Sequence, residues 1–235
     1  MLNQAIFLTG SCPIGVLILH SLYETPSQMS DLAKKLNAAG YTVHAPVLTG
    51  HDQSFEDIIE TDIYQWDEDV KKAYQFLKDN HLKVVVIGMS IGGSLAVKLA
   101  ENSDLFGLIT VNAAIIGFPI AYDIRDFAQK KNDVTVKDYE KHRRKYFDFV
   151  IELGQTANLK KITAPLFVVQ GKKDQNRYKT SSDMLMTLTT STIKERKDYE
   201  NSEHLALLGP DKSQIEKDIL AFIKRLERRN NNANS

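Results

Sequence analysis

One serine lies where a hydrophobic run meets a glycine-rich turn. The run Val84 to Ile87 leads into Gly88-Met89-Ser90-Ile91-Gly92, and an apolar segment containing Ala and Leu follows at once. This order predicts a strand, a sharp turn and a helix, with the hydroxyl of Ser90 raised above the sheet. Glycine suits both flanks because so tight a turn leaves little room for side chains. The pattern is that of a nucleophile elbow, and it predicts Ser90 as a nucleophile.

A serine hydroxyl needs a base to take its proton and an acid to hold that base. Two histidines follow Ser90 in the chain, His142 and His204. His142 lies within the basic run 141–145, where a surface position is expected. His204 lies in a polar loop between the last expected strand and the last expected helix, from which it can reach the top of the sheet. We predict His204 as the base; the alternative is a loop histidine that caps the next helix.

The acid should follow a strand and precede the base, because the chain order in elbow-bearing folds is Ser, then Asp or Glu, then His. Asp174 follows the hydrophobic run 166–170 through the turn Gly171-Lys172-Lys173. We predict Asp174 as the acid, although an aspartate in such a turn can also bond its own backbone. The acids that compete for the role are Asp183, Asp198 and Glu200.

Two backbone amides should stabilise a negatively charged oxygen in the reaction. The first is that of Ile91, directly after the nucleophile. The second should come from the loop after the expected strand 16–20, where Leu22 is the best candidate. We expect His20 to order that loop rather than to act as a second base.

The remaining pattern alternates strands with helices. Strands are expected over 6–9, 16–20, 41–47, 84–87, 105–111, 166–170 and 193–199, with the first two paired, and helices over 26–39, 61–79 and 213–228. Such alternation predicts a mostly parallel sheet covered on both faces, that is, an α/β fold.

The segment 113–164 is too long for a simple crossover between two core strands. It is rich in aromatic residues, and a helix is expected over 135–153, with the basic run on its solvated face. We predict a cap inserted into a core formed by 1–112 and 165–229, with a disordered polar tail over 230–235. The alternative is a longer helical connection without a role in binding.

The net charge, the cysteine count and the lengths of the hydrophobic runs limit which partners and which location are expected. The chain has 235 residues, 30 basic and 30 acidic side chains and no net charge, which argues against nucleic acid or an anionic membrane surface as the main partner. Cys12 is the one cysteine, so no internal disulfide can form and a reducing compartment is expected. We find no signal peptide and no run long enough to span a membrane, and therefore expect a cytoplasmic protein.

Several motifs of this sequence, in their order and spacing, resemble those of the α/β-hydrolases, and more closely those of the small bacterial carboxylesterases and monoacylglycerol-lipase-like proteins. The resemblance extends from Ile14 to Leu226 and rests on Val16-Leu17-Ile18-Leu19-His20, Leu48-Thr49-Gly50-His51, the helix containing Trp66, Gly88-Met89-Ser90-Ile91-Gly92-Gly93, Gly171-Lys172-Lys173-Asp174 and Ser202-Glu203-His204. It implies a triad of Ser90, Asp174 and His204 with oxyanion amides from Leu22 and Ile91. The chain departs from the family at Ser21 and Glu203, where glycine is usual.

The resemblance implies a serine carboxylesterase that acts on short- to medium-chain acyl esters, including monoacylglycerol-like ones. No metal or organic cofactor is expected, because neither a metal-ligand cluster nor a dinucleotide fingerprint is present. The expected partner is a small-molecule ester, and the oligomeric state stays open. A thioesterase or acyltransferase with the same triad is the first alternative, and a non-catalytic binding protein is the second.

Overall fold

The computed structural model describes residues 4–51, 57–58, 61–80, 82–116, 149, 152 and 156–233. Most of the predicted cap over 113–164, with its expected helix and His142, lies outside the described residues.

Seven runs within the described residues form one sheet in the order β1-β3-β2-β4-β5-β6-β7. Every neighbouring pair is parallel except β1 and β3. The strands are β1 (Ile6–Leu8), β2 (Ile14–Leu19), β3 (Thr42–Ala45), β4 (Lys83–Met89), β5 (Gly107–Val111), β6 (Leu166–Gly171) and β7 (Lys194–Tyr199). The predicted α/β fold class, with a mostly parallel sheet, is confirmed.

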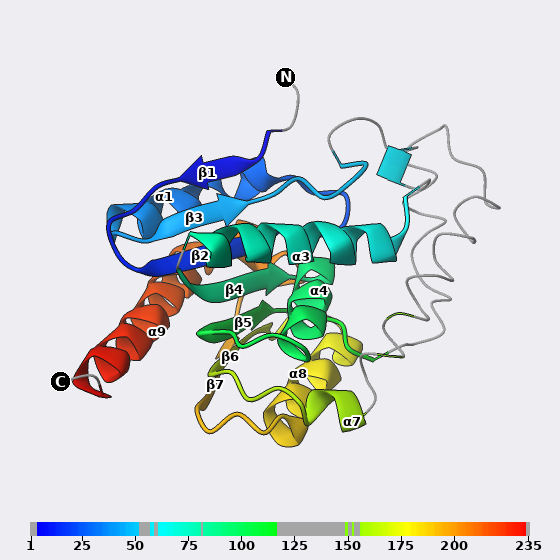
Figure 1. The fold of residues 1–235 in the computed structure, drawn as a ribbon. Helices are drawn as coiled ribbons and strands as arrows, with labels where there is room; N and C mark the ends of the chain where they lie inside the picture. The colour runs from blue at the N-terminus through cyan, green and yellow to red at the C-terminus, as the bar shows by residue number, and fades with distance from the viewer. Residues whose placement is uncertain are drawn as a thin grey trace.

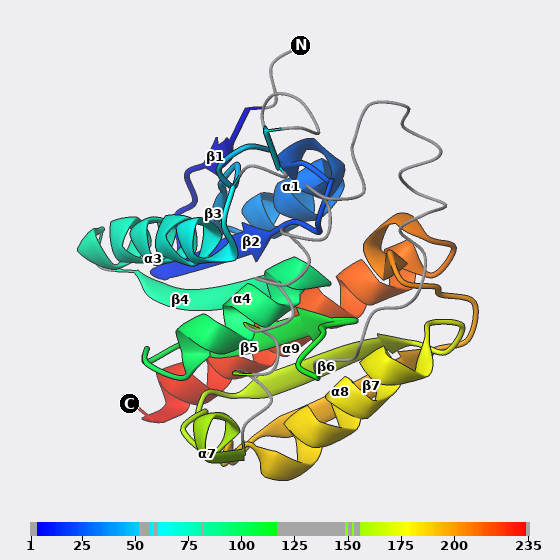
Figure 2. The ribbon, with the colours of Figure 1, turned by 90° about the vertical axis from the view of Figure 1, so that its right-hand side faces the viewer.

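Helices cover both faces of this sheet. On one face, α3 (Ile63–Asp79), α4 (Ile91–Ala100), α7 (Thr156–Leu159) and α8 (Asn176–Leu188) supply buried side chains to a common core. On the other face, α1 (Ser30–Ala38) and α9 (Lys212–Ala233) supply a second core. Figure 1 shows α3 in front of the sheet, and Figure 2 shows α3 and α1 on opposite sides of β2. This sandwich explains why β2, β4 and β6 are almost wholly apolar.

Two helices that follow β2 and β3 differ in how they begin. A short 3-10 helix, η1 (Pro26–Met29), precedes α1, so the predicted helix over 26–39 is divided in two. Helix α3 begins after Asp62, whose side chain accepts a hydrogen bond from the Tyr64 amide in a capping box with Gln65. Trp66 is fully buried on the inner face of α3. Its indole donates to the Thr49 carbonyl at 2.9 Å and thereby fixes the loop after β3.

The predicted pairing of the first two strands is wrong. β1 runs antiparallel to β3, and β2 lies between β3 and β4. The link between β1 and β2 crosses the start of β3, where the Cys12 amide donates to the Gly40 carbonyl at 2.8 Å. β2 is buried along its whole length, whereas β1 is half exposed, so the apolar strand takes the interior place and β1 the edge.

The last helix is longer than predicted. α9 continues through Ala233, so residues 230–233 of the expected disordered tail are helical. Asn230 accepts a hydrogen bond from the Lys83 ammonium at the start of β4, which attaches this last turn to the sheet. Within the described residues, no helix is both long and apolar enough to cross a membrane.

Candidate active site

Ser90 lies between β4 and α4 in a strained backbone conformation. Its φ is 55° and its ψ is −117°, a region that residues with side chains rarely adopt. The two flanking glycines are needed for steric reasons. A Cβ on Gly88 would lie 2.1 Å from the Gly92 carbonyl oxygen, and a Cβ on Gly92 would lie 2.4 Å from the Leu19 carbonyl oxygen. The predicted elbow is therefore present, with α4 packed directly against the end of β2.

Ser90, His204 and Asp174 come together at the carboxyl ends of the strands. The Ser90 Oγ lies 2.8 Å from His204 Nε2, and His204 Nδ1 lies 3.0 Å from Asp174 Oδ2. The Asp174 side chain is almost fully buried, and that of His204 is about one-third exposed. An ionised carboxylate only accepts hydrogen bonds, so Nδ1 carries the proton and Nε2 is left to accept from the Ser90 hydroxyl. This is the arrangement by which imidazole can act as a general base towards a serine.

The competing acids are engaged elsewhere. Asp183 and Asp198 both pair with Arg196, the latter at 2.8 Å. Glu200 pairs with Lys172 on the surface. None of the three contacts His204, whereas Asp174 does, so the geometry agrees with the acid that the sequence predicted.

The two predicted oxyanion amides lie on adjacent elements. Ile91 is the first residue of α4, where its N–H has no acceptor within the helix. Leu22 is the second residue of a turn in which the Glu24 amide donates to the Ser21 carbonyl at 3.1 Å. Tyr23 completes that turn with a φ of 62°. The turn follows β2, and Gly92 in the first turn of α4 packs against the end of the same strand.

His20 orders the loop that carries Leu22. Its Nδ1 donates to the Ser21 carbonyl at 2.9 Å, and its Nε2 accepts from the Leu48 amide at 3.3 Å. Burial, followed by the neighbouring His51, lowers the pKa of His20 to about 3. His20 is therefore neutral, connects two loops through both ring nitrogens and does not contact Ser90, as expected of an ordering residue.

The two departures from the family pattern take structural roles here. Ser21 is buried, and its carbonyl accepts from both His20 and Glu24. Glu203 exposes its side chain, while its carbonyl accepts from the Asn112 side chain at 2.9 Å. The Glu203 carboxylate thus faces solvent.

Two residues of this site were missed by the sequence analysis. The ring of Tyr178, in the first turn of α8, lies 4.1 Å from that of His204, centroid to centroid. Burial raises the pKa of Tyr178, so its phenol stays protonated. Asn112 follows β5 and hydrogen-bonds the loop that carries His204. Its position at the carboxyl end of the strand next to β4 is the one signal that could have identified it.

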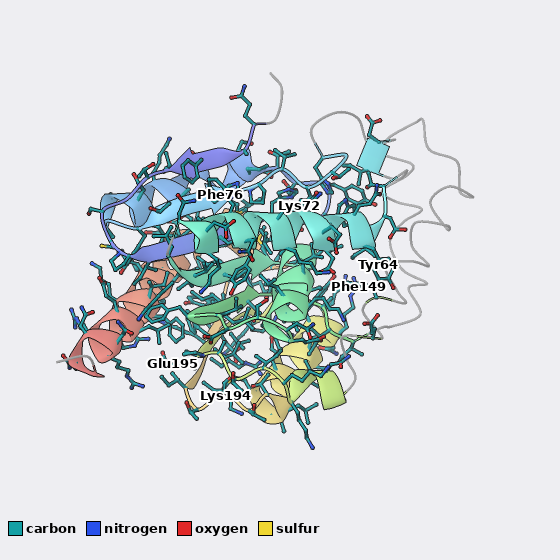
Figure 3. The ribbon with its side chains drawn as sticks, in the orientation of Figure 1. Tyr64, Lys72, Phe76, Phe149, Lys194 and Glu195 are labelled. Carbon is teal, nitrogen blue, oxygen red and sulfur yellow. The ribbon has the colours of Figure 1, made fainter. Side chains whose placement is uncertain are left out.

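Part of the segment 113–164 contacts this edge of the molecule. The ring of Phe149 is fully buried and lies 6.0 Å, edge to face, from that of Tyr64 in the first turn of α3. Figure 3 shows these two side chains together at one end of α3. Glu152 accepts from the Lys98 ammonium of α4 at 2.6 Å. In the part of the chain that the structure describes, no group of three His, Cys, Asp or Glu side chains could hold a metal ion.

Comparison with known proteins finds relatives that are described as hydrolases, lipases and esterases. Residues 14–152 match the family described as Hydrolase_4, serine aminopeptidase S33. The thermostable monoacylglycerol lipase of Bacillus sp. (strain H-257) is 30% identical over 234 residues, which cover 93% of this chain and 94% of that protein. The carboxylesterase of Bacillus subtilis (strain 168) is 24% identical over 228 residues, which cover 90% of this chain and 93% of that protein. A structure from the work on the metagenome-derived lipolytic enzymes LipS and LipT matches 95% of this chain and 98% of its own, with a TM-score of 0.79 and 24% identity.

The sheet order and the elbow between β4 and α4 are those of an α/β-hydrolase, and the family match and the relatives show a serine hydrolase. The chain belongs to the Hydrolase_4 family, and within it to the carboxylesterase and monoacylglycerol-lipase-like group of serine hydrolases. The resemblance recognised from the sequence motifs is confirmed.

Proposed function

We propose that this chain hydrolyses short- to medium-chain acyl esters, monoacylglycerol-like ones included, through an acyl-enzyme on Ser90. The observation that carries the proposal is the continuous pair of contacts from Ser90 Oγ to His204 Nε2 at 2.8 Å and from His204 Nδ1 to Asp174 Oδ2 at 3.0 Å. The names of the relatives, a monoacylglycerol lipase and a carboxylesterase, support ester substrates.

The proposed reaction has two halves. In the first, Ser90 Oγ attacks the ester carbonyl while His204 Nε2 takes its proton, and the amides of Leu22 and Ile91 bind the oxyanion. His204 then gives that proton to the departing alcohol, which leaves the acyl group on Ser90. In the second half, water attacks the acyl group while His204 takes its proton; the bond to Ser90 Oγ then breaks, His204 returns the proton to Oγ, and the carboxylic acid leaves. Asp174 holds the imidazole in the Nδ1–H tautomer throughout.

The acyl range depends on the cap, which we propose over 113–164. Its first residues are attached to the core near Ser90, because the Ser94 hydroxyl donates to the Ala114 carbonyl at 2.6 Å and the Ile115 amide donates to Ser181 Oγ at 3.2 Å. The contact of Phe149 with Tyr64 supports a cap that lies at the carboxyl edge of the sheet. The partner we propose is a small-molecule ester, and a cytoplasmic location stays a prediction from the lone Cys12.

The test is a series of p-nitrophenyl esters from acetate to laurate, assayed with the wild type and with Ser90→Ala. We expect turnover that peaks at one chain length and that disappears in Ser90→Ala while the circular dichroism spectrum is unchanged. Acyl-CoA thioesters of matched chain length serve as the comparison. Faster hydrolysis of the thioesters would mean that thioesters, not esters, are the substrate class. Full turnover in Ser90→Ala would refute the mechanism.

A further inference from the structure

Backbone strain in the described part of the chain is concentrated at the active site. Among the described residues other than glycine, those with positive φ are Tyr23, Ser90 and Asn112. Tyr23 belongs to the turn of the oxyanion amide and Ser90 to the elbow. Asn112 lies directly after β5, with a φ of 47° and no exposed surface. Asparagine adopts positive φ more readily than most residues with side chains, so the reason for Asn112 at this position lies in its side-chain contacts.

The Asn112 side chain makes a complete set of hydrogen bonds. Its Nδ2 donates to the His204 carbonyl at 2.7 Å and to the Glu203 carbonyl at 2.9 Å. Its Oδ1 accepts from the Gly171 amide at 2.8 Å. One buried amide therefore bridges two loops that lie far from it in the sequence.

These two loops carry the acid and the base. Gly171 ends β6, and its carbonyl accepts from the Asp174 amide at 3.2 Å within the turn that presents the carboxylate. The other partners of Asn112 are the base itself and the residue before it. Apart from Asn112, backbone hydrogen bonds also join these two segments: the Lys173 amide donates to the Ser202 carbonyl at 3.0 Å and the Lys172 amide to the Tyr199 carbonyl at 2.9 Å. Among the side chains, that of Asn112 bonds the base residue directly and also the residue that ends β6.

We propose that Asn112 is a positioning residue, which holds the His204 loop against the Asp174 turn so that Nδ1 stays in reach of the carboxylate. The inference rests on the proposed function for its effect on catalysis, but the geometry it predicts can be measured without any substrate. Asn112 does not contact the reacting atoms, because its contacts are to backbone atoms of the loops.

Two substitutions separate the hydrogen bonds from the backbone conformation. Asn112→Asp keeps the size, the tolerance of positive φ and the acceptor for the Gly171 amide, but it replaces both donors with an oxygen that repels the two carbonyls. Asn112→Gly accepts the positive φ without strain and removes every side-chain hydrogen bond. The matched control is Thr110→Val, a change of similar size at a buried position of β5 whose hydroxyl has no hydrogen-bond partner among the described residues.

Two readouts test the proposal. On the preferred p-nitrophenyl ester we expect kcat to fall by about 10²-fold in both Asn112 variants with KM within twofold, because a small displacement of the base acts on the chemical step. Thr110→Val should keep the wild-type kcat. The ¹⁵N shifts of the His204 ring, measured at alkaline pH, should report one Nδ1–H tautomer in the wild type and a mixture in both variants.

The outcomes distinguish this inference from the proposed function. A wild-type kcat in Asn112→Gly would mean that the backbone conformation alone matters and would overturn the positioning role. Wild-type tautomer populations in both variants would also overturn it. If the wild-type protein and Thr110→Val hydrolyse no ester, the proposed function fails, yet the tautomer measurement still decides the role of Asn112. If Asn112→Asp does not fold, Asn112→Gly carries both readouts.

Discussion

His20 should make the protein less stable in mild acid. The folded protein holds this imidazole neutral, with a pKa lowered to about 3 by burial and by His51, whereas the ordinary value is 6.5. Between these two values the unfolded chain binds a proton at His20 that the folded protein does not bind. The stabilisation is therefore fully present above pH 6.5 and is lost as the pH falls towards 3.

The size of the effect follows from the two pKa values. One pKa unit corresponds to about 1.4 kcal/mol, and pH 5 lies about 1.5 units below the ordinary value. Between pH 7 and pH 5 the free energy of unfolding should consequently fall by about 2 kcal/mol on account of His20 alone. Protonation would also break the hydrogen bond that Nε2 accepts from the Leu48 amide, which attaches the segment 48–51 to the end of β2.

The assay is urea unfolding of the wild type and of His20→Gln at pH 7 and pH 5. His20→Gln should be less stable at pH 7, because it loses a buried ring that bonds both the Ser21 carbonyl and the Leu48 amide. Its loss of stability between the two pH values should nevertheless be about 2 kcal/mol smaller than that of the wild type. His44, whose pKa is also lowered by burial, is common to both proteins and cancels in this comparison. Equal losses in the two proteins would refute the reasoning.

Two further predictions concern the site. Ser90→Gly should abolish ester hydrolysis, as Ser90→Ala should, yet be more stable than Ser90→Ala by about 1 kcal/mol, because glycine relieves the strain at a φ of 55°. Thermal unfolding of the two inactive variants measures this difference as a higher melting temperature for Ser90→Gly. Equal melting temperatures would speak against stored strain. Asp174→Asn should lower kcat by about 10⁴-fold with the fold intact, because an amide next to Nδ1 favours the wrong imidazole tautomer; steady-state kinetics with a far-ultraviolet spectrum as control would show it, and a loss of less than tenfold would contradict the role of Asp174.

The elements that the sequence predicted well are those with local causes. Two glycines around Ser90 specify the elbow because the steric clash they avoid lies within the same turn and the adjacent strand. The runs 166–170 and 84–87 are apolar because both faces of their strands are buried. Asp174 and His204 could be predicted because parallel strands bring their carboxyl ends to one edge, where the loops after β6 and β7 meet.

The elements that the sequence did not predict depend on contacts between distant residues. β1 pairs with β3 because burial on both faces favours the apolar β2 for the interior, a competition between strands that no local pattern records. Asn112 bonds residues that are 59, 91 and 92 positions away, so its place at the end of β5 is the one local sign of its role. Tyr178 reaches His204 only because α8 packs beside β6, and an aromatic residue in a helix is ordinarily explained by core packing alone.

The role of Ser90 as the nucleophile can be examined by labelling the protein with an active-site-directed fluorophosphonate. The protein is incubated with the reagent, residual turnover of a p-nitrophenyl ester is followed, and the modified peptide is identified by mass spectrometry. We expect one label per chain, on Ser90, with turnover lost in proportion and no labelling of Ser90→Ala. A label on another residue, or full turnover in a protein whose Ser90 is completely modified, would contradict it.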